Sequence, residues 1–135
     1  SKNPHILNMS PPISLKPKWF ENFTAYTIAK FGMSMCVIGM SAEYKKYNIA
    51  VNALWPKTAI DTAAIRMLGG VVRPEQCRKV DILADASFFV LRRDSNKFTG
   101  KFYIDEEVLA EEGITDLEKY SVKTGEKLFT DLYLD

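Results

Sequence analysis

The segment Ile49-Ala50-Val51-Asn52-Ala53-Leu54-Trp55-Pro56 decides the fold of this chain. Its short apolar run is typical of a strand buried in a parallel sheet, and Pro56 ends the strand because proline cannot donate to a ladder. The run His5-Ile6-Leu7-Asn8-Met9-Ser10 has the same character and predicts an earlier strand. Between the two, residues 23–44 carry apolar side chains at helical spacing, which predicts a long helix with Asn22 as its N-cap. The order is therefore strand, helix, strand.

The rest of the chain continues this alternation. Residues 61–68 have helical character, and Gly69-Gly70 is a signal for the end of a helix. Pro74 can open another helix. Its predicted apolar face consists of Val80, Leu83, Ala84 and Leu91.

A third strand is predicted at residues 99–104, which alternate polar and apolar side chains after a turn at Ser95-Asn96. Residues 106–113 predict a short acidic helix, and the remaining chain to residue 135 predicts irregular structure. Three strands that alternate with helices indicate the α/β class, a doubly wound parallel sheet with right-handed crossovers and helices on both faces.

The composition narrows the class of protein further. With 135 residues, 47% of them apolar, the chain can form one domain with a substantial core. Its 18 Lys and Arg nearly cancel its 17 Asp and Glu, and Arg92-Arg93 has no interleaved aromatic residues, so we expect no nucleic-acid partner. No stretch approaches the roughly 20 apolar residues of a membrane span, and none is predicted. Cys36 and Cys77 lie in helical patterns, which favours a reduced, intracellular setting.

The candidate chemistry centres on Tyr26 and Lys30, which share one face of the predicted helix because they are four residues apart. An unperturbed tyrosine has a pKa near 10, and a nearby ammonium lowers it by favouring the charged form. A tyrosine tuned in this way can exchange a proton with a carbonyl or alcohol oxygen, and Ser10 would hold the same oxygen. A tyrosine and a lysine at this spacing often occur together by chance. The position of this pair after a strand that ends in Ser10 favours a functional interpretation.

Other candidate residues have simpler interpretations. Cys36 is predicted to be a small core residue, and His5, the single histidine, has no partner for a nucleophilic triad or a metal site. Asp81 and Asp85 are expected on a solvated helix face rather than as a paired acid and base. The methionines of the long helix are expected in the core or in a helix contact; they are Met33, Met35 and Met40.

In this order, Ser10, Tyr26-Thr27-Ile28-Ala29-Lys30 and Val51-Asn52-Ala53-Leu54-Trp55-Pro56 resemble the second half of a short-chain dehydrogenase/reductase. The resemblance implies a Rossmann-like sheet of which this chain holds the last three strands. It also implies that Tyr26 is the general acid/base, that Ser10 orients the substrate carbonyl, and that Lys30 lowers the pKa of Tyr26 while bonding the nicotinamide ribose. Hydride would then pass directly between cofactor and substrate.

The resemblance also implies a cofactor loop after the second strand. The family holds the nicotinamide carboxamide there, which would fall here to Pro56, Ile60 and Thr62, together with Tyr26 and Lys30. The family usually has glycine after the loop proline, where this chain has Lys57, and a shift of one residue would give the role of Thr62 to Thr58. The expected cofactor is NADP(H) in preference to NAD(H).

Several expectations concern the protein as a whole. The chain begins without Met and has no Gly-x-x-x-Gly-x-Gly turn, so we expect it to be part of a longer enzyme and inactive alone. Residues 1–129 would be the C-terminal half of the dehydrogenase domain, and residues 130–135 a tail or the start of a linker. The resemblance implies a lipid-like substrate such as a steroid or fatty acyl group, a homodimer or homotetramer, and a peroxisomal or mitochondrial location. The alternative is a non-catalytic lipid-binding or assembly module on the same fold.

Overall fold

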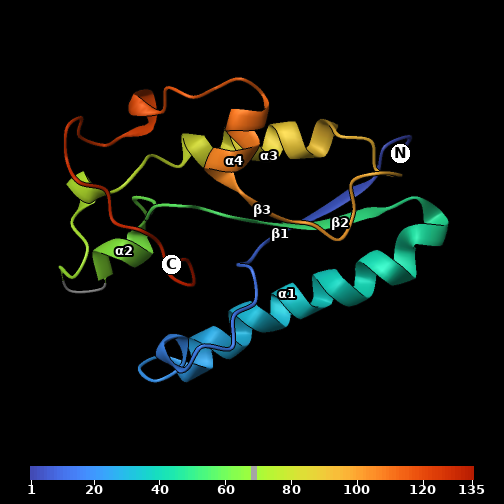
Figure 1. Cartoon of the computed structure of the whole chain (residues 1–135), viewed down its shortest axis with the longest axis horizontal. Coiled ribbons are helices and arrows are strands. Elements are labelled where there is room, and N and C mark those ends of the chain that lie inside the picture. The colour runs from blue at the N-terminus through green and yellow to red at the C-terminus, as the bar shows by residue number, and fades with distance from the viewer. Residues whose placement is uncertain (68–69) are drawn as a thin grey trace. The chain divides into compact units, whose positions relative to one another are not determined.

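The computed structural model describes residues 1–67 and 70–135 (Figure 1). They form two compact units, one made of Ser1–Trp55 with Val90–Tyr103 and the other of Pro56–Phe89 with Ile104–Asp135. The predicted helix stop at Gly69-Gly70 falls partly outside the described residues.

The first unit is built on β1 (His5–Met9) and β2 (Ala50–Trp55), which pair in parallel from His5↔Ala50 to Met9↔Leu54. β3 (Phe102–Ile104) completes a three-stranded sheet in the order β1-β2-β3, and its last residue belongs to the second unit. All six residues of β2 are buried, as the proline-bounded apolar run predicts for a central strand. The predicted α/β class with a parallel sheet is confirmed.

The third strand is shorter than predicted, although the residues before it already bond the backbone of β2: the N–H of Gly100 donates to the carbonyl of Val51 (2.8 Å), and the carbonyl of Lys101 accepts from the N–H of Ala53 (2.8 Å). Asn52, inside β2, donates from Nδ2 to the carbonyl of Phe98 (2.8 Å) and accepts from the N–H of Lys101 at Oδ1 (2.9 Å). Gly100 has a φ of 72°, a left-handed conformation outside regular strand geometry. β3 therefore begins only at residue 102, and the buried amide of Asn52 is satisfied.

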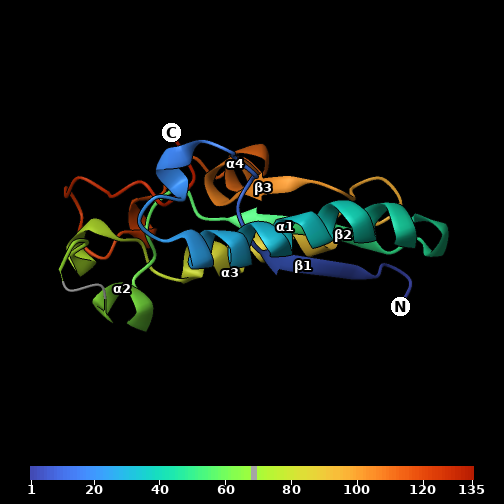
Figure 2. The same cartoon turned by 90° about the horizontal axis from the view of Figure 1, so that it is seen from below.

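The long helix α1 (Thr24–Tyr44) packs against β1 and β2, and Figure 2 shows it running along both strands. Val37 lies in the core between helix and sheet with Val51 and Ala53. The predicted N-cap at Asn22 is wrong, since Phe23 occupies that position. The prediction for Cys36 is also wrong, because its side chain lies on the exposed face of the helix.

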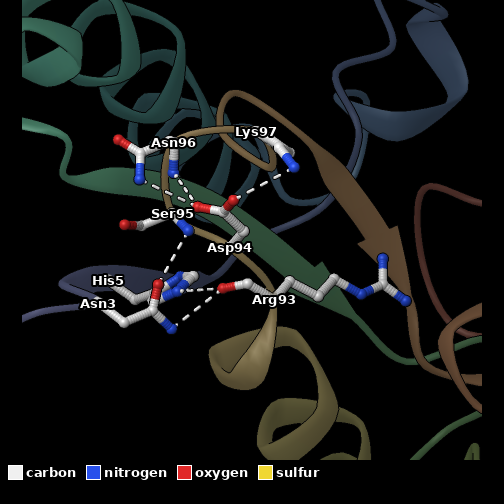
Figure 3. Close-up of polar contacts among 7 residues, drawn as sticks. All are labelled: Asn3, His5, Arg93, Asp94, Ser95, Asn96 and Lys97. Carbon is white, nitrogen blue, oxygen red and sulfur yellow. Dashed lines mark hydrogen bonds and ion pairs between the residues drawn. The ribbon is translucent and has the colours of Figure 1, made fainter.

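The N-terminal segment fastens the loop that follows α3 (Asp81–Arg92), as Figure 3 shows. Asn3 donates from Nδ2 to the carbonyl of Arg93 (3.1 Å) and accepts from the N–H of Ser95 (2.9 Å). His5 Nε2 lies 2.9 Å from the same Arg93 carbonyl, and it must carry the hydrogen because a carbonyl only accepts. The single histidine is therefore a structural residue of the first unit.

The second unit contains α2 (Ala63–Met67), most of α3 and α4 (Asp105–Glu111). One hydrophobic cluster of this unit joins the loop after β2 to α3, α4 and the C-terminal segment. The buried members are Ile60, Ile82, Leu109 and Tyr120. Short 3-10 turns complete the described part of the chain, at Pro17–Trp19, Lys45–Tyr47, Pro74–Gln76 and Glu118–Tyr120.

The predicted face of the helix after Pro74 is wrong. Pro74 opens only a 3-10 turn, Cys77 follows it in a buried bend, and α3 starts at Asp81. Ile82, Ala86 and Val90 are buried, four residues apart, whereas Val80, Ala84 and Leu91 are exposed and Leu83 is half-buried. The helix carries apolar side chains on more than one face, and packing rather than spacing selects which face is buried.

The loop after β2 makes isolated backbone bridges to other segments of the second unit. Thr58 bridges Thr130 antiparallel, and Ile60 bridges Arg78 in parallel. Neither helix nor strand follows Tyr120 in the described chain, but Tyr133 is buried and the tail is paired. No described helix combines the length and apolarity that a membrane span needs.

Candidate functional site

Ser10 directly follows β1 and is held in place from α1. Two buried hydroxyls of that helix bond the intervening loop: Ser34 donates to the carbonyl of Pro11 (2.6 Å) and Thr27 to that of Trp19 (2.5 Å). Ser10 is 1% exposed, and its Oγ has no hydrogen-bond partner within the described chain. A buried hydroxyl without a partner is costly, so this one is available to a group that the chain does not itself supply.

Tyr26 and Lys30 lie one turn apart on α1, beside the end of β1. The Lys30 ammonium donates to the carbonyl of Met9 (3.3 Å), the residue before Ser10. It lies 6.0 Å from the ring centroid of Tyr26 and 5.5 Å from that of Trp55. Tyr26 is 46% exposed. The structure thus brings Lys30, Tyr26 and the Ser10 end of β1 to one place in the first unit, as the sequence predicts from strand end and helix spacing.

The predicted cofactor loop belongs to the second unit. Pro56 and Ile60 are buried, Thr62 is exposed, and Thr58 is buried with its Oγ1 unpaired in the described residues. Burial and the unpaired hydroxyl make Thr58 as strong a candidate as Thr62, so both alternatives stay open.

The peptide groups of Ile60 are directed away from its neighbouring segment. Arg78 donates its N–H to the carbonyl of Ala59 (2.9 Å) and accepts from the N–H of Asp61 (2.9 Å). In a trans peptide the carbonyl and the N–H point in opposite directions. The N–H and carbonyl of Ile60 therefore point away from Arg78, where they can meet a ligand.

Residues that the sequence did not single out hold this loop. The N–H of Lys57 donates to Oδ1 of Asp105 (2.8 Å), and its carbonyl accepts from the N–H of Asp131 (3.0 Å). Burial raises the pKa of both carboxyls to about 6. Arg78, nearly buried, pairs with Glu106 on α4. One feature of the sequence could have pointed to this support: Asp105 is an acidic residue that directly follows the apolar end of β3.

The structure also bears on the prediction for Asp85. Asp85 was expected on a solvated face, but its Oδ2 accepts a 2.5 Å hydrogen bond from the hydroxyl of Tyr120. Burial and this carboxylate raise the pKa of Tyr120 to about 12. Among the described residues, no group of three or more His, Cys, Asp or Glu side chains is placed to hold a metal ion.

Parallel strands, a serine after the first of them and a Tyr-x-x-x-Lys pair on the crossover helix define the class of short-chain dehydrogenases, to which this chain is related. It is homologous over its whole length to hydroxysteroid dehydrogenase-like protein 2. The protein of that name from Danio rerio is 58% identical over 135 residues, and the chain spans 32% of its length. No family model matches the sequence.

Solved structures agree with this relationship. A putative dehydrogenase from Xanthomonas campestris superposes with a TM-score of 0.95 at 49% identity, over 100% of this chain and 49% of that protein. A short chain dehydrogenase from Mycobacterium thermoresistibile gives a TM-score of 0.88 at 43% identity, over 100% of this chain and 48% of that one. The chain therefore spans about half the length of these dehydrogenases and about a third of the curated relatives.

Proposed function

We propose that this chain is the C-terminal half of the dehydrogenase domain of a longer enzyme, which transfers hydride between NAD(P)(H) and a carbonyl or secondary alcohol. The observation that carries the proposal is the Lys30 ammonium, fixed on the Met9 carbonyl and near the Tyr26 ring at the end of β1. A bound nicotinamide dinucleotide supplies or accepts the hydride. The residues of this chain bind the cofactor, orient the substrate oxygen and exchange a proton with it.

Each of the three residues has a separate role. The hydroxyl of Tyr26 gives its proton to the substrate oxygen during reduction and takes it back during oxidation. The ammonium of Lys30, near the Tyr26 ring, would stabilise the tyrosinate that forms when Tyr26 gives up its proton. The unpaired hydroxyl of Ser10 donates to the substrate oxygen and fixes it for proton transfer.

The loop after β2 fits a polar group of the cofactor. The outward N–H and carbonyl of Ile60 can pair with a carboxamide, which offers both an acceptor and a donor. The hydroxyl of Thr58 or Thr62 would supply a further bond, and Pro56 starts the loop. NADP(H) is proposed in preference to NAD(H).

The proposed substrate is a lipid-like carbonyl compound or alcohol, such as a steroid or fatty acyl derivative, and the proposed location is a peroxisome or mitochondrion. The name of the curated relatives supports the substrate class.

The test is a fluorescence titration of NADPH and NADH against the 135-residue chain and against the full-length protein that contains it. We expect binding by the full-length protein alone, because the chain lacks the glycine-rich turn that cradles the pyrophosphate. Absence of binding to the full-length protein would favour the non-catalytic lipid-binding or assembly module, for which Lys57 in place of glycine is the supporting residue.

We also propose that the protein forms a homodimer or homotetramer through α1. The helix also leaves apolar side chains exposed beside its buried residues, namely Ile28, Met35 and Ile38. An apolar helix face of this kind is typical of a surface that is covered by a partner. The substitution Ile38→Asp should shift the full-length protein towards the monomer in light scattering, whereas Glu21→Gln, also exposed, should leave its mass unchanged. A wild-type protein that is already a monomer would contradict the proposal.

A further inference from the structure

Asp105 is a fully buried carboxyl whose hydrogen bonds are unevenly divided between its two oxygens. It is 0% exposed, at the first residue of α4. Oδ1 accepts from the N–H of Lys57 (2.8 Å) and from that of its neighbour Glu106 (2.7 Å), whereas Oδ2 is buried and has no partner in the described part of the chain. The bond to Lys57 links Asp105 to a part of the chain that is 48 residues away in the sequence.

Lys57 is the residue through which the loop leaves β2, after Pro56. Asp105 fixes the peptide before Lys57, and the N–H of Asp131 fixes the peptide after it. These two peptides fix the start of residues 57–60, because each residue has only two soft backbone dihedrals and the chain continues from the orientation of these peptides. Asp105 therefore fixes the start of the segment that presents the N–H and carbonyl of Ile60.

We propose that Asp105 is a positioning residue for cofactor binding, whose ionised carboxylate holds the Lys57 peptide so that Ile60 meets the nicotinamide carboxamide. This inference rests on the proposed function and adds to it a residue that acts through the loop rather than by contact with the cofactor.

Stability alone does not explain a charged group at this position. Burial is the main cause that raises the pKa of Asp105 to about 6; the N–H groups of Lys57 and Glu106 and the guanidinium of Arg78 oppose it, and the Glu106 carboxylate adds to it. The folded protein therefore takes up a proton between the ordinary value of 3.8 and about 6. The stability gained from that proton is present below the ordinary pKa and is lost as the pH rises through about 6. At neutral pH the ionised form is kept at a cost in stability.

Protonation should weaken the hold on the loop. The proton can bind the unpaired Oδ2, which leaves Oδ1 as the carbonyl oxygen of a neutral acid. A hydrogen bond to a neutral acceptor is roughly half as strong as one to a carboxylate. Asparagine reproduces this neutral state at every pH, since its Oδ1 can still accept from Lys57.

The experiment measures the dissociation constants of NADH and NADPH by fluorescence titration on the full-length protein at about pH 5 and about pH 8. The variants are wild type, Asp105→Asn and Glu107→Gln, an exposed carboxyl on the same helix. Any effect of pH on the cofactor itself is the same for all three proteins. The test is therefore the difference in dissociation constant between wild type and Asp105→Asn at each pH. At the higher pH we expect Asp105→Asn to bind about fivefold to tenfold more weakly than wild type and Glu107→Gln to bind like wild type. At the lower pH the three should converge.

A thermal melt at the higher pH separates positioning from simple stabilisation. We expect Asp105→Asn to keep or raise the melting temperature while it loses affinity. Equal affinity of wild type and Asp105→Asn at both pH values would overturn the inference and leave the proposed function standing. Weaker binding together with a lower melting temperature would reduce Asp105 to a structural residue. Absence of binding by wild type at both pH values would overturn the proposed function, and this inference with it.

Discussion

Tyr26→Phe in the full-length protein should lower kcat by about 10²- to 10⁴-fold, the range that a positioned general acid contributes. The substitution removes a single hydroxyl and keeps the ring, so the packing of α1 and the 6.0 Å approach of Lys30 to the ring should be preserved. The dissociation constants of NADPH and NADH should change little. The measurement is the loss of NADPH absorbance with a carbonyl substrate that the wild-type enzyme turns over, beside a cofactor titration of both proteins.

The matched control is Tyr47→Phe, since Tyr47 is an exposed tyrosine whose ring also lies beside a lysine ammonium, that of Lys46. It should turn over like wild type. If Tyr26→Phe retained wild-type kcat, another group would have to supply the proton and the proposed role of Tyr26 would be wrong. If it instead lost cofactor binding along with turnover, its contribution would be to binding rather than to proton transfer.

The sequence predicted the part of this site that local patterns determine. Tyr26 and Lys30 are four residues apart on a helix that was visible from its composition, and Ser10 follows a strand that was visible as a short apolar run. Lys30 then reaches the Met9 carbonyl because strand, crossover helix and parallel strand bring the helix face beside the strand end. The parallel pairing of β1 with β2 follows from the same order.

The support of the loop after β2 could not be predicted, because it comes from distant segments. Asp105 bonds Lys57 across 48 residues, and Thr130 bridges Thr58 from the C-terminal tail. No local spacing records such contacts. The prediction of the buried face of α3 was wrong for a related reason. Phe88 is as apolar as the buried Ile82, and only tertiary packing decides that Phe88 is exposed.

Leu109→Ala should lower the free energy of unfolding by about 2–5 kcal/mol, the usual cost of removing a buried leucine side chain. Leu109 is fully buried on α4 and lies in one cluster with Ile60, Ile82 and Tyr120. Leu15→Ala makes the same chemical change at an exposed position and should cost less than about 0.5 kcal/mol. The measurement is urea unfolding of the full-length protein, with attention to a shift in midpoint at an unchanged slope.

The packing lost in Leu109→Ala should also affect the proposed cofactor loop. Ile60 presents its peptide groups away from Arg78 while its side chain packs in the cluster that contains Leu109. Loss of that packing should loosen the loop and weaken cofactor binding, in contrast to Tyr26→Phe, which removes turnover alone. If Leu109→Ala lost stability but bound NADPH like wild type, the path of the loop would be set by the backbone bonds to Asp105 and Asp131 without help from the core.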